Sequence, residues 1–143
     1  MIGKALSVVA FFAGTAVLRA DNPTPEAPKL TNADVAVKAA GITTQIQEID
    51  HQLMMLKARA VKLKDVIKVN CVNDKLVQAK AQMNIADNAN TNLQIALSKN
   101  NDDERNTEFT NLTTAADQIK QLKEEAAACI GAPELLKQEA GLT

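Results

Sequence analysis

The stretch Ser98-Lys99-Asn100-Asn101-Asp102-Asp103-Glu104 separates two long runs of regularly spaced apolar residues. Paired asparagines favour a turn, because asparagine tolerates left-handed backbone conformations. Asn101 can cap a following helix, with Glu104 three residues further on. Three acidic residues in a first turn also suit the positive end of a helix. The stretch therefore predicts a turn between two helices.

Apolar residues on both sides of this turn recur at spacings of three and four residues, which is typical of helices that pack along one face. The run before the turn, here called the second stripe, is Val72, Leu76, Ala79, Met83, Ala86, Asn90, Leu93 and Leu97. The run after it, the third stripe, is Phe109, Leu112, Ala116, Ile119, Leu122, Ala126 and Cys129. Asn90 either fixes the register inside the core or lies in water with Ala89 turned inward. Gly131 is expected to end the last helix.

The two stripes match each other across the turn. Residues that face each other in an antiparallel hairpin have numbers with a nearly constant sum. The sum is 202 for Leu93 with Phe109, Asn90 with Leu112, Ala86 with Ala116, Met83 with Ile119 and Leu76 with Ala126. It is 201 for Ala79 with Leu122 and 200 for Cys71 with Cys129. A helical hairpin therefore brings the two cysteines side by side at its open end.

Residues 1–20 have the order of an export signal. Lys4 precedes an apolar run at residues 5–17, small residues follow, and Asp21 begins a polar stretch. We expect cleavage after Ala20, with Ala16 as the alternative. An uncleaved membrane anchor is the other interpretation, but the run is shorter than the roughly 20 apolar residues of a span. The chain is therefore expected to be exported, periplasmic or extracellular, with no membrane span in its mature part.

Export predicts that the two cysteines form a disulfide, because two cysteines in an oxidising compartment usually pair. A Cys71–Cys129 bond closes a loop of about 60 residues, for which the chain-entropy description gives about 4 kcal/mol of stabilisation. Two reduced thiols in the core and an intermolecular bridge are the alternatives. The intramolecular disulfide is the preferred prediction.

A further apolar run, the first stripe, precedes the hairpin. It consists of Ile42, Ile46, Ile49, Leu53, Leu56, Ala60, Leu63 and Ile67. Thr44 and Gln47 have the spacing of a capping box near its start. The phase of the pattern slips at Asn70-Cys71-Val72-Asn73, which indicates either a break between helices or a stutter in one long helix.

The predicted fold class is all-α, with helices at about 33–69, 72–99 and 102–130. Residues 21–32 carry three of the four prolines and are predicted to be a flexible arm before a helical domain at 33–131. Residues 132–143 are expected to form a short turn and tail. A two-helix hairpin alone buries little surface. The first helix must therefore fold back into a three-helix bundle or pair with another chain as an extended coiled coil.

The composition argues against several classes of function. Without Lys4 and Arg19 of the signal, the 16 basic residues fall to 14, against 17 acidic residues, so a strongly basic nucleic-acid binder is excluded. The mature part has one serine, Ser98, one histidine, His51, and no phosphate-binding glycine loop. We therefore expect no enzyme, no cofactor and no nucleic-acid partner; the residues do not indicate any small-molecule ligand.

The charges are unevenly distributed along the chain. Residues 57–80 hold seven basic and two acidic residues, whereas residues 81–139 hold five basic and ten acidic residues. Attraction between solvated helix faces explains this simply. The alternative is a basic strip that faces an anionic component of the envelope.

Soft metal ligands occur together once. His51 and Met55 lie one helical turn apart, and Met54 is adjacent. Imidazole and thioether groups suit copper, but Met commonly fills the flanks of a packed stripe. No metal site is predicted here, and a copper carrier is kept only as a remote alternative function.

The run Val66-Ile67-Lys68-Val69-Asn70-Cys71-Val72-Asn73-Asp74-Lys75-Leu76 resembles a segment of an uncharacterised family of secreted helical proteins from myxobacteria and related bacteria. Glu108-Phe109-Thr110 and the segment from Glu125 to Cys129-Ile130-Gly131 occur there in the same order. The resemblance covers about residues 60–131. It implies a bacterial envelope or secreted location and supports the pairing of the two cysteines, but it implies no activity.

These observations favour a non-enzymatic, exported structural or interaction protein of the bacterial envelope. Its helix at 42–67 is expected to bind a protein partner or a second copy through a coiled-coil surface. A periplasmic holdase-type chaperone, or stress-related protein, is the alternative function. Exposed apolar surface distinguishes the two, because a holdase needs it to hold unfolded clients.

Overall fold

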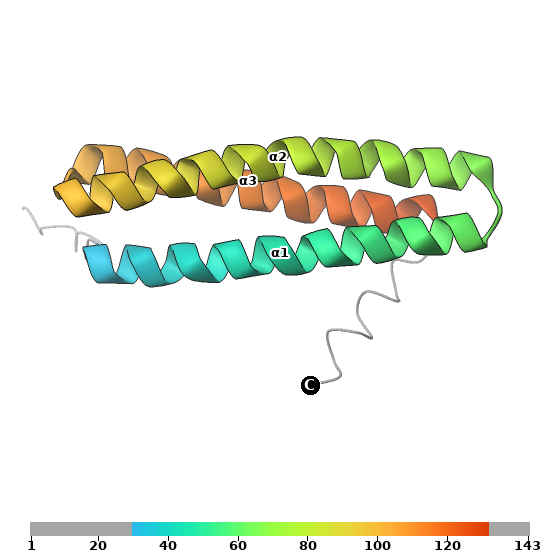
Figure 1. The fold of residues 1–143 in the computed structure, drawn as a ribbon, viewed down its shortest axis with the longest axis horizontal. Helices are drawn as coiled ribbons and strands as arrows, with labels where there is room; N and C mark the ends of the chain where they lie inside the picture. The colour runs from blue at the N-terminus through green and yellow to red at the C-terminus, as the bar shows by residue number, and fades with distance from the viewer. Residues whose placement is uncertain (1–29, 132–143) are drawn as a thin grey trace, which may run out of the picture.

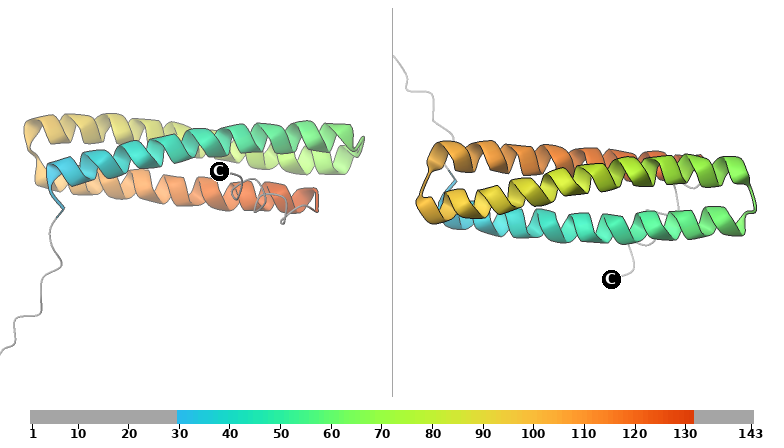
Figure 2. Two further views of the ribbon diagram at one scale, coloured as in Figure 1. Left: turned by 90° about the horizontal axis from the view of Figure 1, so that it is seen from below. Right: turned by 45° about the horizontal axis from the view of Figure 1, so that its top comes forward.

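The computed structural model describes residues 30–131. They form three long helices, α1 (Asn32–Lys62), α2 (Val66–Lys99) and α3 (Asp102–Cys129), and no strand lies within this range. The helices pack side by side, and each helix is antiparallel to the one before it in the sequence (Figure 1). The all-α prediction is confirmed, and α1 folds back onto the hairpin to complete a three-helix bundle (Figure 2). The predicted signal, nearly all of the proline-rich arm and the tail at 132–143 lie outside the described residues.

α1 begins one residue earlier than predicted, at a capping box that the sequence analysis missed. The Thr31 hydroxyl accepts a hydrogen bond from the Asp34 amide at 3.2 Å, and the Asp34 carboxylate accepts one from the Thr31 amide at 3.1 Å. The predicted box at Thr44 and Gln47 is wrong. Thr44 lies inside α1, where its hydroxyl donates to the carbonyl of Ala40 at 3.1 Å, because the helix already runs from Asn32.

The predicted end of the first helix at about 69 is also wrong. α1 ends at Lys62, and Lys64 adopts a left-handed conformation with φ 55°. Asp65 then caps α2 by accepting hydrogen bonds from the amides of Ile67 and Lys68, at 3.0 and 3.2 Å. The chain turns at residues 63–65, and the segment 70–73, where the break or stutter was expected, lies within α2.

The turn between α2 and α3 matches its prediction. Asn100 is left-handed, with φ 52° and ψ 38°, and ends α2. Asn101 accepts a hydrogen bond from the amide of Glu104 at 3.2 Å, and its amide group donates to the Glu104 carboxylate at 3.0 Å. Gly131 follows α3 with φ 72°, a conformation that glycine adopts without strain.

The core runs the length of the bundle and joins the three stripes. Its largest fully buried side chains are Leu53, Leu93, Leu112, Ile119, Val35 and Val72. Ala89 is buried, so α2 is rotated slightly from the predicted stripe and the alternative is correct for Ala89. Asn90 is half-buried, between the two predicted placements. The same rotation buries Ala96 and leaves Leu97 partly buried. Many core residues are alanines, so the helices approach closely but each contact buries little area.

Candidate functional site

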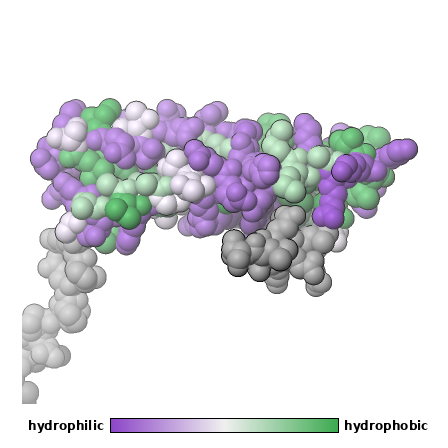
Figure 3. Space-filling view, turned by 60° about the horizontal axis from the view of Figure 1, so that its bottom comes forward, coloured by the Kyte–Doolittle hydropathy of each residue, from purple (hydrophilic) through white to green (hydrophobic). Residues whose placement is uncertain are grey.

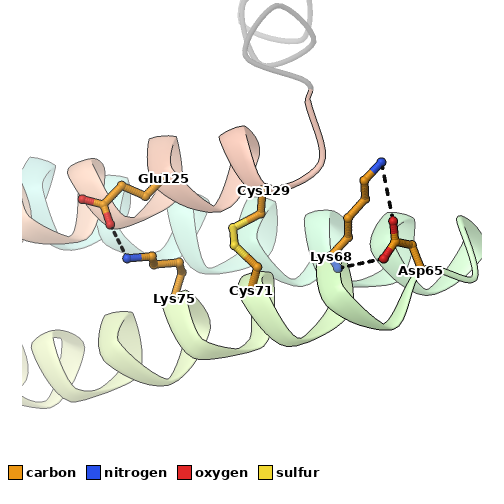
Figure 4. Close-up of a disulfide and its surroundings, with 6 residues drawn as sticks. All are labelled: Asp65, Lys68, Cys71, Lys75, Glu125 and Cys129. Atoms are coloured by element: carbon orange, nitrogen blue, oxygen red, sulfur yellow. Dashed lines mark hydrogen bonds and ion pairs between the residues drawn. A yellow bond between two sulfur atoms is a disulfide. The ribbon is translucent and has the colours of Figure 1, made fainter.

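The disulfide lies at the open end of the α2–α3 hairpin, as predicted. Cys71 in the second turn of α2 is bonded to Cys129, the last residue of α3, with 5.9 Å between their Cα atoms and a separation of 58 residues (Figure 4). This confirms the intramolecular pairing over both alternatives. It also fixes where α3 stops relative to α2.

An ion pair one turn further along supports the same junction. The Lys75 ammonium lies 2.5 Å from a carboxylate oxygen of Glu125 (Figure 4). The hydrogen bonds from Lys75 and then from Gln121 hold the pKa of the Glu125 carboxyl below its ordinary value. The pair is partly exposed, so it orients the two helices more than it stabilises them.

The first stripe, which the sequence analysis proposed as an interaction surface, is largely internal. Ile46, Ile49, Leu53, Leu56 and Ala60 are all buried within the bundle. These side chains pack against the second and third stripes of the same chain. This face of α1 is therefore covered by the other two helices of the same chain.

The end of the first stripe has the opposite environment. Leu63 is 50% exposed and Ile67 is 81% exposed, because the chain turns before either can continue the stripe. Val61 and Val66 beside them are 54% and 72% exposed. We call residues 61–68 the tip. Its four large aliphatic side chains are all exposed at one end of the bundle.

Basic side chains flank these apolar groups. They are Lys57, Arg59, Lys62, Lys64 and Lys68. Within residues 57–68 the only acidic residue is Asp65. Its carboxylate caps α2 and lies 3.9 Å from the ammonium group of Lys68. Figure 3 shows hydrophobic and hydrophilic side chains interleaved at the right-hand end, where α1 and α2 meet. The tip thus combines exposed aliphatic surface with positive charge.

The tip was not predicted, because Leu63 and Ile67 fit the spacing of the first stripe. One local signal could have revealed it. In Val61-Lys62-Leu63-Lys64-Asp65, lysine alternates with aliphatic residues, which does not fit the buried face of a helix, and Asp65 can cap a new one.

The residues considered for copper are not joined by further metal-binding side chains in the described part of the chain. His51, Met54 and Met55 are all exposed on the surface of α1. Among residues 30–131, no group of three or more His, Cys, Asp or Glu side chains is placed to hold a metal ion. Nothing in the geometry thus adds to the copper alternative.

An open groove of about 570 Å³ lies between α2 and α3. Its lining is dominated by amide side chains, including Gln82, Asn88, Asn92, Asn111 and Gln118, with Glu108 as the one ionisable residue. Ala89 and Ala115 form its floor and are almost fully buried. Ile85 and the hydroxyl residue Thr114 complete the lining, and we assign no reaction to this groove.

None of α1, α2 and α3 is both long enough and apolar enough to cross a membrane. No protein family, curated protein or solved structure matches this chain. The similarity to a family of secreted proteins therefore stays a prediction, and the geometry of the bundle carries the functional argument.

Proposed function

We propose that the protein is a non-enzymatic, exported interaction protein of the bacterial envelope. In this proposal the three-helix bundle is a rigid body that presents the tip to a binding partner. The observation that carries the proposal is the exposure of Val61, Leu63, Val66 and Ile67 together, beside five basic residues. Single exposed aliphatic residues are ordinary on protein surfaces, but a contiguous group is typical of an interaction site.

The build of the bundle supports this role. α2 has 34 residues, which corresponds to a length of about 50 Å at 1.5 Å per residue. The disulfide joins α2 to α3 a few residues from the tip. A clasp at this position limits the fraying that a helix end otherwise undergoes. The tip is therefore held on a rigid support.

Two features support the exported location within this proposal. Residues 1–20 have the order of an export signal, and the two cysteines of the chain are paired. Structural disulfides persist in oxidising compartments and are rare in the cytosol. Fractionation of producing cells, followed by intact-mass measurement, tests the location and the predicted cleavage after Ala20 together.

Site-specific photo-crosslinking tests the proposed function. A photoreactive amino acid at Ile67, in the tip, is compared with one at Val77, which is 62% exposed on the side of α2. We expect crosslinks to other envelope components from position 67 and few from position 77. Equal labelling from both positions, or none from position 67, would contradict an interaction role for the tip.

The same exposed aliphatic group supports the holdase alternative. A holdase holds unfolded clients through apolar surface, so it should suppress the aggregation of an unfolded test protein measured by light scattering. We expect no suppression at equimolar ratio, because most of the large apolar side chains of the bundle are buried in its core or packed against it. Suppression that is lost in Ile67→Ser would favour the holdase instead.

A further inference from the structure

We infer that the tip docks on an anionic lipid surface, with its aliphatic side chains inserted among the lipid headgroups and its basic residues over the lipid phosphates. This inference rests on the proposed function and names the partner of the same site. It goes beyond that function because it identifies a class of molecule, an anionic lipid bilayer.

The shape of the tip favours a lipid surface. Cys129 ends α3 and is bonded to Cys71, so residues 66–70 of α2, together with the end of α1, extend beyond the end of α3. Figures 1 and 2 both show the α1–α2 connection projecting past α3. Within residues 30–131, a narrow, two-helix end is thus available for contact. A stable protein interface needs about 800 Å² on each partner, whereas a bilayer accommodates a small convex projection.

The chemistry of the tip fits the same partner. The most exposed aliphatic side chains of the tip are Ile67 at 81% and Val66 at 72%, at the very start of α2, where they point away from the core. Lys62, Lys64 and Lys68 lie within six residues of them. One signal gives only marginal membrane binding, whereas an apolar group combined with a basic cluster binds more stably. The tip supplies both from one short segment.

The charge of the whole bundle favours an end-on orientation. Five basic residues and one acidic residue lie at positions 57–68. At the opposite end, Asp102, Asp103 and Glu104 form the first turn of α3, and Asp34 lies in the first turn of α1. The basic residues Lys99 and Arg105 also lie at this end, so these groups are negative on balance. A negatively charged surface attracts the first end and repels the second. The bundle would then stand on the membrane with its acidic end away from it.

The residue types also set the expected salt dependence. The chain has no Trp and no Tyr, the residues that usually anchor proteins at a membrane interface. The aliphatic side chains are smaller, so a large share of the binding must come from the basic residues. Binding should therefore weaken strongly as ionic strength rises.

Vesicle co-sedimentation tests the inference directly. The protein is produced in an exporting host, recovered in its oxidised form and checked by intact mass, so that every variant is compared in the same processing state. It is mixed with vesicles that contain phosphatidylglycerol or with vesicles of phosphatidylcholine alone. We expect binding to the anionic vesicles that is reduced by added salt, and little binding to the zwitterionic vesicles.

Two pairs of variants locate the binding surface. Val66→Ser combined with Ile67→Ser removes the most exposed aliphatic groups of the tip and should weaken binding about tenfold. The matched control is Val77→Ser combined with Ile85→Ser, which removes two exposed aliphatic side chains from the side of α2 and should bind as the wild type does. Circular dichroism should show unchanged helix content in both, because none of these four side chains is buried.

The charge pair is Lys62→Gln with Lys64→Asn. Asparagine suits the left-handed conformation at position 64, so the turn is retained. This pair should weaken binding to anionic vesicles and reduce its dependence on salt. The control, Lys38→Gln with Lys99→Gln, removes the same charge from exposed positions toward the opposite end of the bundle and should change little.

The outcomes separate this inference from the function on which it rests. The lipid inference is overturned if the wild type does not bind anionic vesicles, or if the tip variants and their controls bind equally well. If position 67 crosslinks specifically to a protein, or to a second copy of the chain, while vesicles are not bound, the tip is an interaction site but not for lipid. If neither vesicles nor crosslinks involve the tip, both proposals fail.

Discussion

Adjacent residues on α1 show how strictly the bundle separates its faces. Leu53 is fully buried, whereas Met54 beside it is 50% exposed. The two side chains differ by about 100° in direction around the helix, which is enough to move one from the core to the solvent. The stripe spacing of three and four residues thus determines which side chains are buried and contribute to the free energy of unfolding.

This contrast leads to a matched test of the core. Leu53→Ala should lower the free energy of unfolding by about 2–5 kcal/mol, because it removes buried methyl groups and leaves a cavity. Met54→Ala changes an exposed side chain of similar size and should cost less than about 0.5 kcal/mol. Urea denaturation of the oxidised proteins measures both. Similar losses in the two variants would show that α1 is not rotated as described.

Two left-handed residues mark the two turns, and they differ in how visible they are in the sequence. Asn100 is a residue type that tolerates this conformation, and it was recognised as a turn residue. Lys64 adopts almost the same φ, 55° against 52°, although lysine has no such preference. The second turn was therefore missed, and with it the end of α1.

At the scale of the helices, the α2–α3 hairpin is the most strongly specified unit. Its turn is capped at both ends by asparagine, its stripes match across the turn, and a disulfide joins its open end. The alanine-rich layers between the two helices, such as Ala86 and Ala116, bury little area. The covalent link is thus expected to make a large contribution to stability.

Removal of the link gives the corresponding prediction. Cys71→Ser combined with Cys129→Ser should lower the free energy of unfolding by about 4 kcal/mol, since it releases a loop of 58 residues in the unfolded chain. Urea denaturation measures the loss. A reducing agent should destabilise the wild type by a similar amount and leave the double variant unchanged. An equal response of both proteins to the reducing agent would show that the bond contributes nothing.

At the scale of the whole molecule, the decisive feature is that α1 packs on the hairpin of its own chain. The first stripe contributes Ile46, Ile49, Leu53 and Leu56 to a single core. An extended coiled coil with another chain would need the same face, so the two arrangements exclude each other. Four exposed aliphatic side chains then lie close together in the sequence at the tip.

Solution scattering tests this arrangement. The oxidised protein should be an elongated monomer, with a mass by light scattering that equals the chain mass, 15.3 kDa before any processing. Small-angle X-ray scattering should give a longest helical dimension near 50 Å, as expected from the length of α2. A stable dimer that dissociates in Leu53→Ala would mean instead that the first stripe pairs between chains.

The sequence by itself determined the helical class, the α2–α3 turn, the cap at Asn101, the helix end at Gly131 and the pairing of Cys71 with Cys129. These features depend on local backbone preferences and on distances along one hairpin, which can be read from residue numbers. Local signals at Thr31 and Asp65 were also present, but stronger-looking patterns elsewhere obscured them.

Only the tertiary structure decided the partner of the first stripe, the rotation that buries Ala89 in place of Asn90, and the exposure of Leu63 and Ile67. An apolar stripe requires burial but does not specify what covers it. Successive side chains point about 100° apart around a helix, so a small rotation of the helix decides which of two neighbours is buried. The candidate site was hidden for the same reason, because its residues continue a buried pattern until the chain turns and leaves them in solvent.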